Sequence, residues 1–335
     1  MTSKNLLLIS FCVLAGLCAR AEALDIVLTN DDGVESALTQ ALASSLRAAG
    51  HRVIVSAPAQ DQSGTGGGIN FLRPITALTA PSRGGAIANG APGIGILPGD
   101  PQSFYVNSSP VAASLYGIDI AAPRVFGKLP DLVISGPNYG NNTGLINNHS
   151  GTVNAALIAI NRGIPAIAVS CEAPLNYRPV SQLQRGDIDF EIAEIVVLLV
   201  NTLEARRTVG GNALLPPGIG LNVNIPAFTA GRGKDLPIRF SRVGLASFVI
   251  PFFTENLSQD PVAQQFGANV AAPGVTLSLS PSLPRGLSVL PDVNPTSEQN
   301  VVRSGAVAIS VIEGTHQAPE ETRLQVIQKL DSLVR

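Results

Sequence analysis

Residues 24–34 read LDIVLTNDDGV, an apolar run of strand type that ends abruptly in a polar turn. Open α/β sheets place their ligand sites in such turns, at the carboxyl ends of the strands. Two adjacent carboxylates repel each other there unless a cation or several donors neutralise them. The stretch therefore predicts one of two things: a hard divalent metal held by Asp31 and Asp32, with Gly33 allowing the tight turn, or a solvated turn with ordinary Asn-Asp-Asp-Gly chemistry.

The first half of the chain alternates strand and helix patterns. A helix is predicted from Ser36, its cap, to Gly50, its stop, and another is predicted from Val153 to Gly163. Ser109-Pro110 opens a short helix, whereas residues 80–100 show no period and predict an irregular surface loop. Buried strands are predicted at 24–28, 51–58, 130–135 and 164–170. This alternation favours an α/β fold with three layers and a mostly parallel sheet.

The second half is less regular. The longest helical pattern covers 187–206, and a terminal amphipathic helix is predicted over 320–333. Residues 245–300 are rich in Pro, Ser and Asn and predict a protruding β-hairpin with long loops. Further strands are predicted at 218–226 and near 237–243, 274–280 and 305–312. We expect a single domain over 24–335, with its core at about 24–230 and an extended C-terminal extension at about 231–335.

The N-terminal residues have the pattern of a secretory signal peptide. Lys4 precedes an apolar run, and Ala21-Glu22-Ala23 supplies a cleavage site of the small-x-small type. We therefore expect residues 1–23 to direct export, to the periplasm or the medium. Apart from two cysteines in this segment, the chain has Cys171, which predicts a buried, unreactive thiol and no internal disulfide.

Composition excludes several partners. The net charge of the 335 residues is -2, aromatic residues make up 4% and tryptophan is absent. The chain therefore lacks both the basic footprint and the stacking platform of a protein that binds nucleic-acid polymers. No later stretch reaches membrane-spanning length without charges, proline or glycine, so we expect no membrane partner.

Polar side chains follow several of the predicted strands, and together they supply the ligands of one site. Asp31, Asp32, Ser63 and Asn138 offer carboxylate, hydroxyl and amide oxygens, which suit Mg²⁺ or Mn²⁺. Ser150-Gly151-Thr152 lies at a helix N-terminus, where free N–H groups and the helix dipole attract an anion. A metal beside an anion site is the arrangement that phosphoryl transfer uses.

The chain resembles the SurE family, whose members are metal-dependent acid phosphatases and 5′-nucleotidases. The resemblance rests on four ordered blocks: Thr29-Asn30-Asp31-Asp32-Gly33-Val34, Ala57-Pro58 with Gln62-Ser63-Gly64, Ser135-Gly136-Pro137-Asn138 with Asn142, and Ser150-Gly151-Thr152-Val153. It implies a Rossmann-like core and a C-terminal hairpin that exchanges between subunits of a dimer or tetramer. It also implies one metal site formed by Asp31, Asp32, Ser63 and Asn138, and a phosphate site formed by Asn142, Ser150, Gly151 and Thr152.

The chain departs from the family pattern at three places. Proline replaces the usual isoleucine or valine at position 137, which removes a backbone donor from the site loop. His149 replaces the usual aromatic residue, and the helix that starts at Ser109-Pro110 lacks the usual acid. His149 has two interpretations, as an acid that protonates the leaving group or as a filler of aromatic size.

The resemblance predicts hydrolysis of a small phosphate ester, such as a nucleoside monophosphate, by water activated at one divalent metal ion, Mg²⁺ or Mn²⁺. Asp31 and Asp32 would hold the metal, and one of them could orient the water. An aspartyl-phosphate route is a disfavoured alternative. Haloacid-dehalogenase-like phosphatases, which use it, place Asp-x-Asp after the first strand, whereas Asp31 and Asp32 are adjacent, and adjacent residues of a strand face opposite ways. The departures at Pro137 and His149 motivate a second alternative, an exported binding protein with the same fold and a degenerate site.

Overall fold

A nine-stranded sheet dominates the computed structural model, which describes residues 22–172, 176–207, 213–247, 249–265, 267–278 and 292–315. Its strands, in spatial order, are β3 (Ile94–Leu97), β4 (Asp100–Val106), β2 (Arg52–Pro58), β1 (Asp25–Thr29), β5 (Leu132–Tyr139), β6 (Ala166–Cys171), β7 (Ile219–Ile225), β11 (Val307–Glu313) and β8 (Ile238–Ser241). The six central strands, from β4 to β7, are mutually parallel. β3 and β11 pair antiparallel to their inner neighbours. The predicted, mostly parallel sheet is therefore confirmed.

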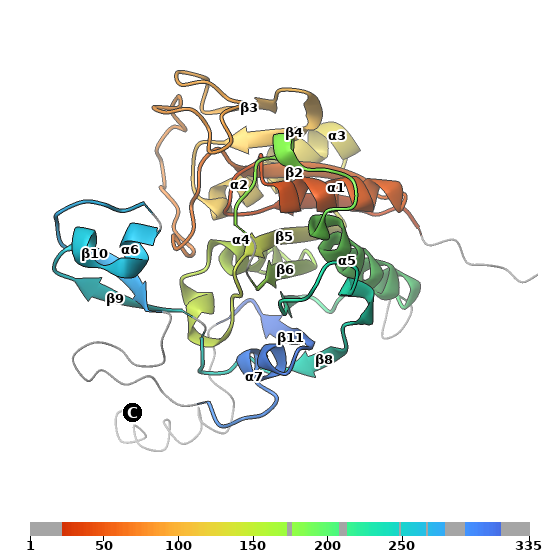
Figure 1. The fold of residues 1–335 in the computed structure, drawn as a ribbon. Coiled ribbons are helices and arrows are strands. Elements are labelled where there is room, and N and C mark those ends of the chain that lie inside the picture. Colours follow the sequence, from red (N-terminus) through yellow and green to blue (C-terminus); the bar gives the residue numbers. More distant parts are fainter. Residues whose placement is uncertain are drawn as a thin grey trace, which may run out of the picture.

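Helices cover both faces of this sheet (Figure 1). The α-helices are α1 (Ala37–Ala48), α2 (Pro110–Tyr116), α3 (Ala122–Phe126), α4 (Gly151–Ile160), α5 (Ile188–Ala205), α6 (Pro261–Gln265) and α7 (Glu298–Arg303). Short 3-10 or π turns are η1 (Gly117–Ala121), η2 (Gly144–Asn148), η3 (Val180–Gln182), η4 (Gly233–Asp235) and η5 (Leu257–Gln259). Helices α1 and α5 pack together on one face, and α2 and α4 pack together on the other.

The alternation of side chains along β1 explains why its sequence is apolar throughout. Ile26 and Leu28 belong to the core cluster that contains the apolar side chains of α1 and α5. Val27 points the other way, into the cluster that contains those of α4. A parallel strand covered on both faces needs apolar residues at every position, because successive side chains point to opposite sides.

The predicted boundaries of the main helices are confirmed by their caps. Ser36 accepts a hydrogen bond from the Thr39 N–H (3.5 Å), and Gly50, just after α1, adopts a φ of +98°. Glycine reaches this left-handed region without strain, which suits it to end a helix. Ser150 caps α4 by accepting from the Val153 N–H (3.1 Å).

The C-terminal part contributes both to the sheet and to a separate hairpin. β8, β11 and α7 complete one side of the nine-stranded sheet. β9 (Ile250–Thr254) and β10 (Gly274–Ser278) form the predicted antiparallel hairpin, which stands away from the sheet (Figure 1). Most of the predicted signal peptide (1–21) and the helix predicted over 320–333 lie outside the described residues. In the part of the chain that is described, none of the helices is long and apolar enough to cross a membrane.

Two expectations about loops were wrong. The stretch 80–100, expected to be irregular, contains β3 and leads into β4. These strands were missed because β3 is interrupted by Gly95 and β4 begins with Asp100-Pro101-Gln102, which are exposed or partly exposed, so neither strand has an alternating pattern. The loop expected from Gly136 onward begins only after Tyr139, because β5 continues through Gly136 and a cis peptide bond to Pro137.

Candidate metal and phosphate site

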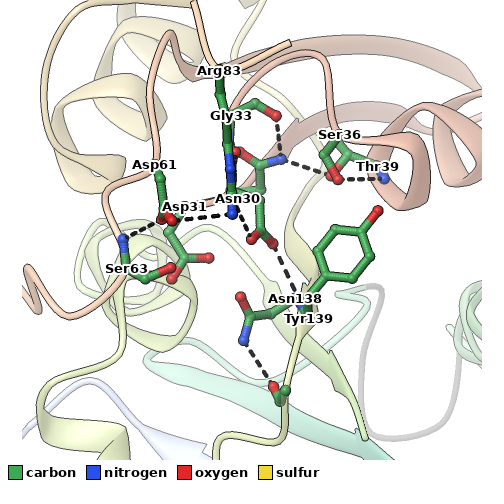
Figure 2. A network of polar contacts seen from close by, with 12 residues as sticks. Asn30, Asp31, Gly33, Ser36, Thr39, Asp61, Ser63, Arg83, Asn138 and Tyr139 are labelled. Atoms are coloured by element: carbon green, nitrogen blue, oxygen red, sulfur yellow. Dashed lines mark hydrogen bonds and ion pairs between the residues drawn. The ribbon is translucent and has the colours of Figure 1, made fainter. Parts of the chain in front are cut away.

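The turn after β1 is locked by Asn30. Its side-chain oxygen accepts from the Gly33 N–H (3.0 Å), and its amide donates to the Gly33 carbonyl (2.8 Å) and to Thr39 Oγ1 (2.7 Å). Gly33 adopts a φ of +111°, which favours glycine. Figure 2 shows this network at the edge of the sheet. These hydrogen bonds hold the turn together, so Asp31 and Asp32 are held at the carboxyl end of β1.

Asp31 lies at the N-terminus of α4 and is 2% exposed. Its carboxylate accepts from Thr152 Oγ1 (2.7 Å) and from the Thr152 N–H (3.2 Å). Helix and carboxylate approach so closely that a Cβ on Gly151 would lie 2.8 Å from the Asp31 Cβ. Burial raises the pKa of Asp31 to about 6, although the bonds from Thr152 act in the opposite direction. A helix N-terminus and a hydroxyl thus fix one buried carboxylate in place.

Asp32 is 3% exposed and is held from the other side. Arg83 donates through Nη1 to Asp32 Oδ1 (3.1 Å) and to the Asp32 carbonyl (3.0 Å). The Tyr139 N–H approaches Asp32 Oδ2 at 3.4 Å. Burial, followed by repulsion from Asp31, raises the pKa of Asp32 well above its usual range, while Arg83 lowers it. Two adjacent buried carboxylates are costly to ionise together, and a bound cation would remove that cost.

A bulge in β5 brings Asn138 to the same edge. The register with β6 shifts between Ser135 and Asn138, so β5 carries one extra residue there. Bulges of this kind commonly re-aim side chains beside active sites. The Asn138 Nδ2 donates to the Gly140 carbonyl (2.8 Å), and its amide oxygen lies on the side of Asp31 (Figure 2). Buried Cys171 donates from Sγ to the Asn138 carbonyl (3.1 Å), which confirms the expected buried thiol.

Ser63 lies in the exposed loop after β2. Its N–H donates to Asp61 Oδ1 (2.9 Å), and its hydroxyl lies beside the Asp31 carboxylate in Figure 2. The loop is joined to the β1 turn because the Gln62 N–H donates to the Asp31 carbonyl (2.8 Å). The structure thus gathers Asp31, Asp32, Ser63 and Asn138 at one edge of the sheet.

The structure gives the expected phosphate ligands different contacts, and not all of them are free to bind a phosphate. Thr152 directs both its donors at Asp31, and Ser150 caps the Val153 N–H. Within the described structure, the Gly151 N–H has no recorded acceptor, so in the first turn of α4 it is the donor left for an anion. Asn142 donates to Ser170 Oγ (2.9 Å) and belongs to a buried polar network next to β6 and β7. The imidazole of His149 is exposed and therefore does not fill the core.

Arg83 and Asp61 were missed from the sequence. Arg83 comes from the stretch expected to be a surface loop, and its Nη2 pairs with Asp61 Oδ2 (3.2 Å). Its guanidinium lies over the Tyr177 ring, 3.8 Å from the centroid. One signal was present: Arg83 is the single charged residue between Arg73 and Asp100.

The donor set fits a hard divalent cation. Among the described residues, His, Cys, Asp and Glu side chains form no group of three or more that could hold a metal ion without other ligands. Two carboxylates would therefore need the oxygens of Asn138, Ser63 and water to complete a coordination shell. An all-oxygen set of this kind suits Mg²⁺ or Mn²⁺ and does not suit zinc.

The fold and site define a class: a Rossmann-like α/β protein with a buried carboxylate pair beside a helix N-terminus. Residues 26–248 match the family model described as "Survival protein SurE". The chain belongs to the SurE family, as its sequence motifs predicted.

Two curated relatives and a solved structure agree with this assignment. The chain is 36% identical over 205 residues to "Acid phosphatase" of Yarrowia lipolytica. The matched segment covers 60% of this chain and 56% of that protein. It is 36% identical over 203 residues to "5′-nucleotidase SurE 1" of Thermus thermophilus, and this match covers 60% of this chain and 66% of that protein. It thus spans less than two thirds of the length of both. The crystal structure of the SurE protein from Aquifex aeolicus has the same fold, with a TM-score of 0.60, 22% identity, and coverage of 91% and 99%.

Proposed function

We propose that this chain hydrolyses phosphate monoesters with the help of one divalent metal ion, Mg²⁺ or Mn²⁺. The observation that carries the proposal is the buried pair Asp31 and Asp32, fixed at the N-terminus of α4. The names of the relatives, acid phosphatase and 5′-nucleotidase, support this reaction class. They also support a small substrate such as a nucleoside monophosphate.

Each residue of the site has a separate task in this proposal. Asp31, Asp32, Ser63 and Asn138 would hold the metal, which when bound supplies a Lewis acid for the phosphoryl oxygen and an acidified water. The Gly151 N–H and the dipole of α4 would stabilise negative charge on the phosphoryl group.

The remaining residues of the site would support Asp31, the leaving group and the bound phosphate. Thr152 favours the ionised form of Asp31 and orients its carboxylate by donating two hydrogen bonds to it. Exposed His149 is positioned in the sequence directly before the cap of α4, where it could protonate the leaving oxygen. Ser150 and Asn142 would support the phosphate site, Ser150 by capping α4 and Asn142 by fixing the loop after β5.

We further propose that the protein is exported through residues 1–23 and associates as a dimer or tetramer through the β9–β10 hairpin. Phe253 and Val275 are cross-strand partners there and are 69% and 65% exposed. Paired apolar side chains on a protruding hairpin favour burial against a second subunit. Sedimentation of the wild type and of the variant Phe253→Ser tests this: the variant should dissociate to monomers, and an unchanged sedimentation coefficient would contradict the proposal.

A panel of substrates tests the proposed activity. Nucleoside monophosphates, sugar phosphates, polyphosphate and an aryl phosphate are incubated with the protein before and after treatment with a chelator. We expect hydrolysis of at least one ester, loss of that hydrolysis in the chelator, and recovery on adding Mg²⁺ or Mn²⁺. Binding of phosphate esters without turnover of any of them would instead favour the alternative, a binding protein with the SurE fold.

A further inference from the structure

Arg83 occupies a position between the buried carboxylate pair and an exposed acid (Figure 2). One nitrogen of its guanidinium, Nη1, is directed at Asp32 (3.0 and 3.1 Å), and the other, Nη2, is directed at Asp61 (3.2 Å). We propose that Arg83 is a substrate-binding residue, which keeps its contact with Asp32 and exchanges its contact with Asp61 for an oxygen of the substrate phosphate. This inference rests on the proposed function, because it assigns a further residue to the same site.

The charges at the site require a cation of this kind. Asp31, Asp32 and Asp61 together carry three negative charges when ionised, and one divalent metal ion offsets two of them. Without Arg83 the loaded site would keep a net negative charge and would repel a phosphate dianion. Arg83 brings the local charge to zero.

The two contacts of Arg83 differ in strength, which determines which one is exchanged. The side chain of Asp32 is 4% exposed and that of Asp61 is 44% exposed. An ion pair in contact with water is weak, whereas a buried pair with several hydrogen bonds is costly to break. A phosphate dianion carries more charge than the Asp61 carboxylate, and it accepts hydrogen bonds from the planar fork of an arginine. The contact with Asp61 should therefore be the one that is released.

Tyr177 keeps the guanidinium in place during this exchange. The Arg83 guanidinium lies 3.8 Å from the centroid of the Tyr177 ring, and Tyr139 packs edge-on against the same ring at 5.9 Å. Stacking on an aromatic face restricts the tilt of the guanidinium plane and leaves its edge, which carries the N–H groups, free to donate. The Nη2 group therefore keeps its direction when Asp61 is displaced.

A purely structural role for the guanidinium is the alternative, but the loop that carries Arg83 has other anchors. The Glu35 carboxylate accepts from the N–H groups of Gly84 (3.1 Å) and Ala86 (2.8 Å). The backbone N–H of Arg83 donates to the Ala59 carbonyl (3.1 Å). None of these bonds uses the side chain of Arg83, so replacing the side chain should leave the loop in place.

Calorimetric titration of inorganic phosphate into the Mn²⁺-loaded protein tests the proposal without relying on turnover. Arg83→Gln should bind phosphate about 10- to 100-fold more weakly than the wild type, the cost of losing a hydrogen bond to a charged group. Arg83→Lys, which keeps the charge and loses the fork, should fall between them. Asp61→Asn should bind phosphate about two- to five-fold more tightly, because it removes an exposed competitor for Nη2. The asparagine retains the oxygen that accepts from the Ser63 N–H.

Arg162→Gln is the matched control. Arg162 also pairs with an exposed aspartate, Asp119, and it lies just past the other end of α4, so its loss should leave phosphate affinity unchanged. Wild-type affinity in a folded Arg83→Gln protein would overturn the inference, as would equal weakening in Arg162→Gln. If Arg83→Gln fails to fold, Asp61→Asn decides: tighter binding supports the exchange, and unchanged or weaker binding refutes it. Failure of the proposed function is distinguishable, because it shows as the absence of phosphate release by the wild type in the substrate panel, whereas the role of Arg83 is read from the phosphate affinities of the variants relative to the wild type.

Discussion

Removing the metal should make this protein less stable as the pH rises. Most carboxylates have the opposite effect, because they stabilise the folded state more at higher pH. The perturbation is treatment with a chelator, which leaves Asp31 and Asp32 buried without a cation. Burial raises the pKa of Asp31 from 3.8 to about 6 in the folded chain. The folded state therefore binds this proton more tightly than the unfolded state does. The resulting stabilisation is complete below the unfolded pKa and is lost as the pH rises through about 6.

The size of the effect follows from the shift. Each pKa unit corresponds to about 1.4 kcal/mol, so Asp31 alone should change the free energy of unfolding by about 3 kcal/mol in total. About half of this change should fall between pH 5 and pH 7.5. The pKa of Asp32 is raised as well, and its contribution has the same sign. Carboxylates with a lowered pKa, such as Asp25, act in the opposite direction but titrate below this window.

Urea denaturation of the metal-free protein between pH 5 and pH 7.5, followed by circular dichroism, measures this effect. We expect stability to fall as pH rises, and we expect Asp31→Asn to flatten the profile. Asp119→Asn, which removes an exposed carboxylate, is the control and should leave the slope unchanged. Added Mn²⁺ should stabilise the wild type more at pH 7.5 than at pH 5, because it binds the ionised pair. Equal slopes for the wild type and Asp31→Asn would show that burial of Asp31 does not control the pH dependence.

Three substitutions test the geometry around Asp31 and Asn138. Gly151→Ala would place a Cβ 2.9 Å from Asp31 Oδ2, so we expect displacement of that carboxylate and about a 100-fold loss of kcat/KM, and wild-type kinetics would contradict the close approach. Thr152→Val removes the hydroxyl that donates to Asp31 and should lower metal affinity about 10-fold or more, whereas Thr152→Ser should stay close to wild type in the same Mn²⁺ titration. Cys171→Ala removes a weak donor to the Asn138 carbonyl and should lower the free energy of unfolding by about 1 kcal/mol with little change in turnover. Abolished hydrolysis in that variant would show that the thiol takes part in the chemistry.

The fold could be predicted from sequence wherever local pattern and tertiary structure agree. β1, β2, β5 and β6 are buried on both faces, so continuous apolar runs mark them. β3 and β4 have no such pattern, because they lie at one side of the sheet and most of their residues are exposed or only partly buried. β4 pairs with β2, and β3 pairs with β4, and a single sequence does not display these contacts.

The candidate site could likewise be predicted from sequence only in part. Asp31 and Asp32 stand next to a strong strand signal, and Ser150 to Thr152 stand at a recognisable helix start, so pattern and family resemblance found them. Arg83 reaches the site from 51 residues further along the chain than Asp32, through a loop with no period. The sequence also suggested that the N–H groups of Ser150 to Thr152 would all face the phosphate. It could not show that Thr152 is already engaged by Asp31, because that contact depends on how closely α4 packs against the β1 turn.

The proposed function has one strict requirement: the pair Asp31 and Asp32 must hold the metal on which hydrolysis depends. Its most direct test is a titration of metal-free protein with Mn²⁺, in which bound metal is followed by electron paramagnetic resonance and phosphate release is measured in the same samples. We predict that binding and activity rise together to saturation at one Mn²⁺ per chain, and that Asp32→Asn loses both. Hydrolysis at the wild-type rate by Asp32→Asn, or before any Mn²⁺ is bound, would show that the reaction does not depend on a metal held by this pair.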